Sequence, residues 1–305
     1  MNIMFMGTPD FASVSLRGLV NSGFNVTCAV CQPDKPVGRK QVMTPPDVKI
    51  TAQELGITNI YQPATLKDGS FADVLEKERP DLIVVVAYGK ILPKYVLDFP
   101  KYGCINLHGS ILPKYRGSAP IQWSVINGDS NAGVTTMYMS EGLDCGDIID
   151  IAKTPIGENE TAGELFDRLA KIGSTLLCET IIKIKDGTAT RTPQNNDEAS
   201  LAPMLSKETG RISFEKTAQE IHNLVRGLNP WPLAYIETSK GTLKIYESEI
   251  INKNSGKPAG SIIESSDSLC VQTGDKIISF KTVQLQGKKA MSARDLLRGN
   301  KIELI

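Results

Sequence analysis

The residues best suited to chemistry in this chain are Asn106 and His108, which lie at the end of an apolar segment. His108 is one of only two histidines in 305 residues, and a turn rich in Gly, Ser and Pro follows it. Alternate residues of a strand share a face, so we expect the two side chains to project together. An amide donor beside an imidazole suits a reaction that builds charge on a carbonyl oxygen and moves a proton. The alternative interpretation is a buried polar pair at a strand end, without a catalytic role.

A second polar cluster, the loop 140–147, carries a glycine on either side of Asp144. If this loop lies at the same end of the sheet, Asp144 could hold the imidazole of His108 and stabilise its charged form. The same loop could instead bind a divalent metal ion through Glu141, Asp144 and Asp147. No serine occupies a Gly-x-Ser-x-Gly turn, so we expect direct attack by a substrate nucleophile and no covalent intermediate.

The elements that would position these residues alternate between strand and helix along the first half of the chain. Apolar, β-branched runs predict strands at 2–6, 25–31, 81–87 and 103–108. Helical stretches separate them, at 10–22, 46–55, 70–78 and 118–127. Such alternation predicts a largely parallel sheet with helices on both faces. Two more strands, at 132–140 and 147–155, and a long helix over 161–185 complete a Rossmann-like α/β domain.

The second half of the chain has a different pattern. A polar stretch that is poor in large apolar residues separates it from the first half. A short helix near 215–227 then precedes five strands, near 233–239, 242–252, 259–264, 267–273 and 276–285. Short strands with turn signals between them favour a small OB-like β-barrel. We therefore predict a Rossmann-like catalytic domain over 1–188, a linker over 189–206 and an OB-like domain over 207–305.

The composition is that of a globular protein, with 22% charged residues and a formal net charge of zero. No apolar run approaches the roughly 20 residues of a membrane span, and no signal peptide is evident. Six scattered cysteines indicate a reduced, cytoplasmic protein without contact to a membrane. Residues 207–305 hold fifteen Lys and Arg against eleven Asp and Glu. This basic excess hints at a polyanionic partner, and chance scatter of charge is the alternative.

Two further motifs are better explained by structure than by chemistry. Cys28 and Cys31 fit C-x-x-C, but residues three apart in a strand point to opposite faces. No second cysteine pair is present to complete a zinc site. The second histidine, His222, lies in a predicted helix, where a packed or surface role is expected.

The two polar clusters together resemble the 10-formyltetrahydrofolate-dependent formyltransferases. The resemblance rests on the run 106–120 and on the loop 142–147. Further segments resemble the branch of this family that formylates methionyl-tRNA, namely 7–12, 32–39, 86–93, 229–232 and 287–292. The resemblance therefore covers nearly the whole chain.

The resemblance implies a catalytic trio of Asn106, His108 and Asp144. The α-amine of methionyl-initiator-tRNA would attack the formyl carbon of 10-formyltetrahydrofolate and give formylmethionyl-tRNA for translation initiation. Asn106, together with a protonated His108, would stabilise the oxyanion, and His108 would relay a proton toward the leaving N10. Asp144 would orient His108. The C-terminal OB-like domain would help to bind the tRNA.

Both substrates have expected contacts. The folate co-substrate is expected in a cleft between the loops that follow the strands. Its expected lining residues are Tyr88, Gly89, Ile91, Ser110, Ile111, Leu112, Pro113 and Leu143. The resemblance also implies that an inserted loop at 33–49 reaches the tRNA acceptor arm through Lys35, Arg39 and Lys40. We expect no metal, no tightly bound cofactor and a monomer.

Two alternatives stay open on sequence grounds. The first is a related formyltransferase that acts on glycinamide ribonucleotide or on an amino sugar. The length of the chain and the motifs of its second domain argue against both of these acceptors. The second alternative is a catalytically silent folate- or RNA-binding protein, which would not need all three residues of the trio.

Overall fold

The computed structural model describes residues 1–38, 40–265, 267–299 and 302–305. They form two compact units, each assembled from separate stretches of chain. The first unit comprises Met1–Gly117, Gly133–Thr154 and Phe166–Leu201. The second comprises Ser118–Ala132, Pro155–Leu165 and Ala202–Ile305. The second unit therefore draws two short segments from the N-terminal half of the chain.

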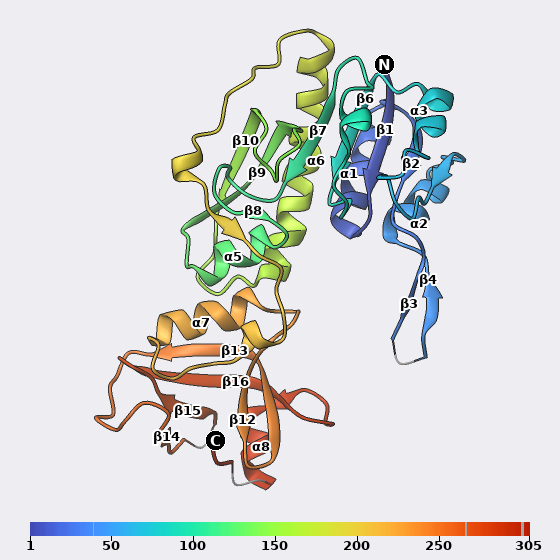
Figure 1. Ribbon diagram of the computed structural model, residues 1–305. Helices are drawn as coiled ribbons and strands as arrows, with labels where there is room; N and C mark the ends of the chain where they lie inside the picture. Colours follow the sequence, from blue (N-terminus) through green and yellow to red (C-terminus); the bar gives the residue numbers. More distant parts are fainter. Residues whose placement is uncertain (39, 266, 300–301) are drawn as a thin grey trace. The chain divides into compact units, whose positions relative to one another are not determined.

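The first unit is built on a seven-stranded sheet in the order β10-β9-β7-β6-β1-β2-β5 (Figure 1). The strands are β1 (Asn2–Gly7), β2 (Asn25–Val30), β5 (Ile60–Tyr61), β6 (Leu82–Val86), β7 (Cys104–His108), β9 (Asn131–Tyr138) and β10 (Ile148–Pro155). The strands from β7 to β5 pair in parallel, whereas β9 runs antiparallel to β7. The prediction of a mostly parallel, Rossmann-like sheet is confirmed.

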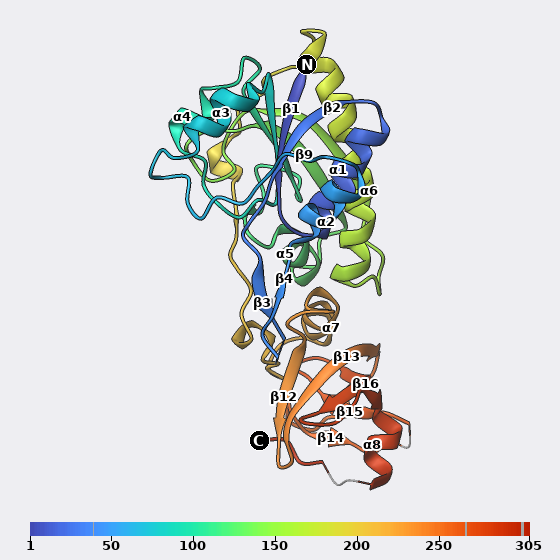
Figure 2. The same cartoon turned by 90° about the vertical axis from the view of Figure 1, so that its right-hand side faces the viewer.

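Helices cover both faces of this sheet. On one face lie α1 (Asp10–Asn21), α2 (Asp47–Glu54) and α6 (Ala162–Lys185), and on the other α3 (Ala72–Glu78) and α4 (Lys94–Leu97) (Figure 2). The rings of Phe11 and Phe166 join α1 to α6 with centroids 5.1 Å apart. The helices cross closely, because a Cβ at Gly18 would lie 1.9 Å from Ser174 Oγ. The central strand β6 is buried along its whole length, as a doubly covered strand requires.

The predicted inserted loop contains a two-stranded hairpin of β3 (Lys35–Val37) and β4 (Val42–Thr44). Its residues are exposed, so side-chain burial does not hold it in place. The Asp34 carboxylate at its base accepts hydrogen bonds from Gln62 Nε2 at 2.7 Å and from Lys49 Nζ at 2.9 Å. These two donors hold the pKa of Asp34 below its usual value. The hairpin is therefore anchored at its base.

The second unit contains a curled antiparallel sheet in the order β12-β13-β16-β15-β14, with β17 paired to β16. Its strands are β12 (Ala234–Thr238), β13 (Gly241–Ile251), β14 (Ile262–Ile263), β15 (Leu269–Gln272), β16 (Ile277–Leu285) and β17 (Met291–Ser292). Its helices are α5 (Pro120–Ile126), α7 (Ala218–Gly227) and α8 (Ala293–Gly299). The strands bury an apolar core that includes Ile245, Phe280 and Val283. The sheet forms a half-barrel, which agrees with the OB-like prediction.

Helix α7 holds the segment Pro155–Leu165 through buried polar side chains. Arg226 Nη1 donates to the carbonyl oxygens of Gly157 at 3.1 Å and Glu160 at 3.3 Å. The His222 ring lies 3.0 Å from Ser248 Oγ and 3.3 Å from the carbonyl oxygen of Glu158. The expected packed role of His222 is therefore confirmed, and burial lowers its pKa. Among the described residues, no helix has the length and apolar character needed to cross a membrane.

Candidate active site

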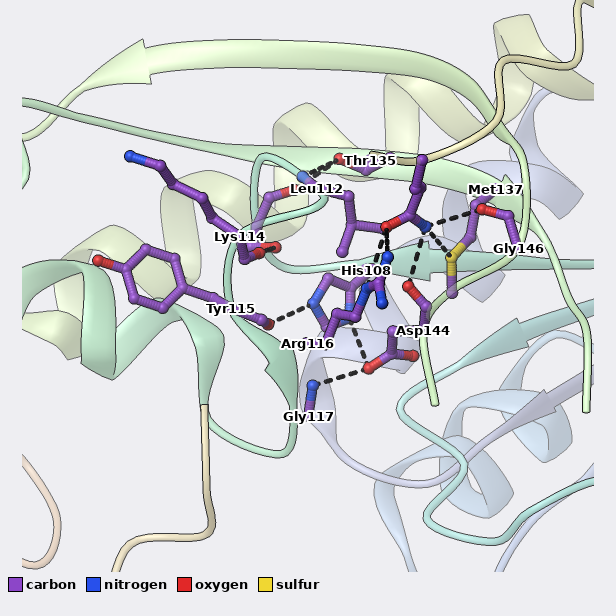
Figure 3. A network of polar contacts seen from close by, with 12 residues as sticks. His108, Leu112, Lys114, Tyr115, Arg116, Gly117, Thr135, Met137, Asp144 and Gly146 are labelled. Atoms are coloured by element: carbon purple, nitrogen blue, oxygen red, sulfur yellow. Dashed lines mark hydrogen bonds and ion pairs between the residues drawn. The ribbon is translucent and has the colours of Figure 1, made fainter. Parts of the chain in front are cut away.

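His108 is the last residue of β7, and its side chain is buried between two hydrogen-bond acceptors (Figure 3). Its Nε2 lies 2.9 Å from the carbonyl oxygen of Tyr115. Its Nδ1 lies 3.6 Å from Oδ2 of Asp144. A carbonyl oxygen only accepts, so Nε2 carries a proton and donates to Tyr115. Nδ1, on the other side of the ring, then faces the Asp144 carboxylate.

Asp144 is held in place by groups from two directions. Gly117 N donates to its Oδ2 at 2.8 Å, and Gln194 Nε2 donates to its carbonyl oxygen at 2.9 Å. Its φ of 47° lies in the left-handed region, which Asp tolerates better than most residues. Nearby, a Cβ on Gly146 would lie 1.8 Å from the carbonyl oxygen of Tyr138, so only glycine fits. The loop 140–147 therefore presents one carboxylate in a fixed position.

Asn106 lies two residues before His108 on β7 and so faces the same side of the sheet. It is half-buried and sits opposite Met137 of β9. Its side-chain amide makes no hydrogen bond to any residue that the structure describes. The structure thus joins His108 to Asp144 and leaves the Asn106 amide available to a ligand.

The expected folate residues after β7 support their own loop. Ser110 Oγ donates to the carbonyl oxygen of Lys114 at 2.6 Å. Thr135 Oγ1 donates to the Ser110 carbonyl oxygen at 2.6 Å and accepts from Leu112 N at 3.2 Å. Ser110 and Leu112 are buried, whereas Ile111 and Pro113 are half-buried. The Ser110 hydroxyl and the Leu112 backbone N–H hold the turn that leads to Tyr115.

The expected folate residues on the other loops fall into two groups. Tyr88 is a core residue, 2% exposed, and burial raises the pKa of its hydroxyl. Its neighbour Gly89 is exposed and adopts a φ of 84°. By contrast, Ile91 is 72% exposed and Leu143 is 58% exposed. Two large apolar side chains, from different loops, are therefore accessible to a ligand.

A cavity of about 400 Å³ lies beside the loop 140–147. Its lining includes Lys94, Leu97, Asp98, Gly103, Cys104, Tyr138, Met139, Ser140, Glu141 and Arg191. The guanidinium of Arg191 stacks 3.6 Å from the centroid of the Tyr138 ring. The sequence analysis did not identify Lys94 or Arg191, because residue type alone does not show whether a charged side chain lines a cavity or is simply solvated.

The expected tRNA contacts lie on or near the hairpin. Lys35 begins β3 and Lys40 lies in the turn before β4, and both are exposed. Arg39 lies outside the described residues. For the alternative metal site, no three His, Cys, Asp or Glu side chains in the described ranges gather as metal ligands would.

Residues 1–181 match the model of the formyl transferase family, and residues 204–301 match that of the formyl transferase C-terminal domain. The chain belongs to the formyltransferase family. The resemblance noted from the sequence is therefore confirmed, and it extends over both halves of the chain.

Among its formyltransferase relatives, the methionyl-tRNA formyltransferase of Clostridioides difficile is 46% identical over 304 residues. The match covers 99% of this chain and 98% of that relative. The methionyl-tRNA formyltransferase of Macrococcus caseolyticus is 45% identical, and the match covers 99% of this chain and 97% of that relative. Both relatives are matched over nearly their whole length.

Solved formyltransferase structures share the fold. WlaRD, a sugar 3N-formyl transferase crystallised with dTDP and 5-N-formyl-THF, superposes with a TM-score of 0.69 at 22% identity. The match covers 95% of this chain and 99% of that one. An N-formyltransferase from Helicobacter canadensis, in complex with folinic acid and dTDP-3-aminofucose, superposes with a TM-score of 0.69 at 23% identity. That match covers 91% of this chain and 98% of the other. At these identities the likeness shows the fold alone.

Proposed function

We propose that this formyltransferase transfers the formyl group of 10-formyltetrahydrofolate to the α-amine of methionyl-initiator-tRNA. The observation that carries the proposal is the 46% identity to a methionyl-tRNA formyltransferase across both domains. The product, formylmethionyl-tRNA, serves translation initiation. The folate is a co-substrate that leaves after each turnover, and it is not a tightly bound cofactor.

In the proposed reaction the free amine attacks the formyl carbon, and the carbonyl electron pair moves onto oxygen. The Asn106 amide donates to that oxygen, a role supported by its lack of another partner in the described structure. His108, in its protonated form, adds positive charge beside the oxyanion. The amine then loses a proton and N10 of the folate gains one as the C–N10 bond breaks. His108 is the proposed relay through Nε2, which must first leave the Tyr115 carbonyl oxygen.

Asp144 supports this relay without touching the substrate. Its Oδ2 faces Nδ1 of His108 at 3.6 Å, and the Tyr115 carbonyl oxygen accepts from Nε2 at 2.9 Å. Together they fix the tilt of the ring. Asp144 is therefore proposed to orient His108, as predicted from the sequence.

The loops around His108 are proposed to bind the folate. The exposed side chains of Ile91 and Leu143 offer apolar contact to its rings. Gly89 is exposed and Ile111 and Pro113 are half-buried, so they are proposed to contact the folate directly. The buried residues Tyr88, Ser110 and Leu112 would act by shaping the loops.

The tRNA is proposed to contact the hairpin and the second unit. Lys35 and Lys40 are exposed cations suited to phosphates, and Arg39 is included on sequence grounds. The basic excess of residues 207–305 supports a polyanionic partner for the second unit.

We further propose that the protein acts as a monomer in the cytoplasm, and its six free cysteines agree with a reducing compartment.

The deciding experiment is formyl transfer from 10-formyltetrahydrofolate to three acceptors in parallel. They are methionyl-initiator-tRNA, free methionine and an amino-sugar nucleotide, the last because sugar formyltransferases share this fold. Formylation of the tRNA alone supports the proposal. Formylation of the sugar nucleotide would keep the chemistry and overturn the acceptor, and inactivity on all three would favour a silent binding protein.

A further inference from the structure

Part of the predicted linker packs against the active site. We call residues 192–200 the bracing segment. Its first residue, Thr192, forms a β-bridge with Ile148 of β10. At its other end, Ser200 Oγ accepts from Tyr115 N at 2.9 Å and the Ser200 carbonyl oxygen accepts from Arg116 N at 2.8 Å. The segment therefore has ordered contacts at both ends, which a flexible linker would lack.

Gln194 is the centre of the bracing segment. Its Nε2 donates to the carbonyl oxygens of Asp144 at 2.9 Å and Gly146 at 2.7 Å. Its Oε1 accepts from Arg116 Nε at 3.1 Å and Nη2 at 2.8 Å. An amide has two N–H donors and one oxygen with two lone pairs, so its whole capacity is used here.

These contacts join the two loops that hold His108. The loop 140–147 supplies Asp144 to Nδ1 of the ring, and the loop 110–117 supplies the Tyr115 carbonyl oxygen to Nε2. Gln194 connects the backbone of the first loop to Arg116, the residue after Tyr115. Asp144 also keeps its left-handed φ of 47° while its own carbonyl oxygen is bonded to Gln194.

We propose that Gln194 is a positioning residue, which sets the Asp144 carboxylate against His108 by fixing the loop 140–147 to Arg116. The inference rests on the proposed function, because it assigns Gln194 a part in the same reaction. A displacement of about 1 Å at a catalytic group costs on the order of 100-fold in rate. Loss of Gln194 should therefore lower kcat far more than it weakens substrate binding.

Two substitutions distinguish the donor role of the Gln194 amide from its acceptor role. Gln194→Met keeps the volume and removes every hydrogen bond of the amide, including the weak one from Nε2 to Met137 Sδ at 3.9 Å. Gln194→Glu keeps an acceptor for Arg116 and removes both donors. We expect both to lower kcat by roughly 10- to 100-fold, with KM for each substrate changed less than about threefold. Full activity of Gln194→Glu would overturn the proposal, because the bonds to the loop 140–147 would then be dispensable.

The matched control is Asn195→Ala. Among the described residues, the Asn195 side chain bonds only within the segment, to Asp197 N at 3.1 Å and Glu198 Oε1 at 3.0 Å. We expect its kcat to stay within about twofold of wild type. A loss as large as that of Gln194→Met would mean that general loosening of the segment, and not Gln194, accounts for the effect.

A double-mutant cycle tests whether Gln194 acts through Asp144. In an Asp144→Asn background, measured by single-turnover kinetics, Gln194→Met should cause little further loss, because the positioned carboxylate is already gone. Fully additive losses would contradict a role through Asp144.

A readout that needs no turnover separates this inference from the proposed function. The chain has two histidines, so a His222→Gln variant assigns the ring ¹⁵N signals of His108 by NMR. In Gln194→Met these signals should move from the wild-type positions toward those of Asp144→Asn, while the thermal midpoint of unfolding stays within a few degrees. Unchanged signals would refute the positioning role, even if the wild-type chain formylated none of the acceptors.

Discussion

Asn106 differs from the other two members of the proposed trio, because its amide has no hydrogen-bonding partner among the described residues. Asn106→Ala should therefore lower kcat by about 100- to 1,000-fold, the usual cost of one oxyanion donor. The free energy of unfolding should hardly change, since no side-chain hydrogen bond to a described residue is lost. Steady-state kinetics and urea unfolding on the same preparation check both statements, and near-normal turnover would remove Asn106 from the mechanism.

The six cysteines differ in their surroundings, and this difference predicts their reactivity. Burial raises the pKa of Cys28 and of Cys104 to about 12 and that of Cys31 to about 11. Because the thiolate is the reactive form, these three should resist iodoacetamide at pH 8 in the native protein. The half-buried Cys145 and Cys178 should be labelled first, as peptide mass spectrometry would reveal. Rapid labelling of Cys28 and Cys31 would instead point to an accessible C-x-x-C motif.

The residue types of the site could be predicted, but their partners only in part. The pairing of His108 with Asp144 was expected and is present, but the reason given for it was wrong. Because β9 runs antiparallel to β7, the loop 140–147 begins beside Cys104, at the start of β7, and not at the end that carries His108. The Tyr115 carbonyl oxygen was not foreseen, because a backbone acceptor leaves no trace in residue identity. Gln194 was missed as well, since a single amide in a polar stretch looks the same whether it is solvated or bonded.

At the scale of elements, most strands of both sheets could be predicted to within a few residues from their apolar patterns, but the two-residue strands β5 and β17 were missed. The sequence predicts 81–87 and 103–108, and the structure has β6 at Leu82–Val86 and β7 at Cys104–His108. The hairpin of β3 and β4 and the short helix α4 were not predicted. The hairpin strands are exposed, so they lack the alternating burial on which sequence patterns depend.

The packing of α7 against Pro155–Leu165 should make the stability of the folded protein depend on pH. Burial lowers the pKa of His222 in the folded state, so the unfolded chain binds the proton more tightly. The stability from neutral His222 is present above its unfolded pKa of about 6.5 and is lost as pH falls toward the folded pKa. Urea unfolding at pH 7.5 and 5.5 should show a smaller free energy of unfolding at the lower pH. In His222→Gln the difference should shrink, and an unchanged difference would assign it to other groups.

The hairpin should affect the binding of only one of the two substrates, the tRNA. Replacing Lys35, Arg39 and Lys40 together by Glu should raise KM for methionyl-initiator-tRNA, because repulsion replaces the attraction to phosphate. KM for the folate should hardly change. Lys67→Glu, an exposed charge reversal outside the hairpin, is the control. Equal effects on both substrates would mean that the hairpin shapes the active site instead.

At the scale of the whole molecule, each unit has a surface suited to a different part of the proposed reaction. The second unit has a cavity of about 520 Å³ whose lining includes Trp231, Lys207 and Lys244. Trp231 is 59% exposed, which suits stacking on a nucleobase. Trp231→Ala should raise KM for the charged tRNA by roughly tenfold, a typical cost of one lost stack, and leave KM for the folate unchanged. An unchanged KM for the tRNA would place its contacts elsewhere on the second unit.

The composition of the second unit from three stretches of chain affects the order in which this protein can mature on the ribosome. Ser118–Ala132 and Pro155–Leu165 emerge early, but most of their packing partners lie in Ala202–Ile305, which is synthesised last. Helix α5 must therefore wait, with Trp123 and Ile126 uncovered, until α7 has left the exit tunnel. A nascent chain arrested near residue 201 would hold a formed first sheet and an uncovered apolar helix, and such a chain is a natural client for a chaperone.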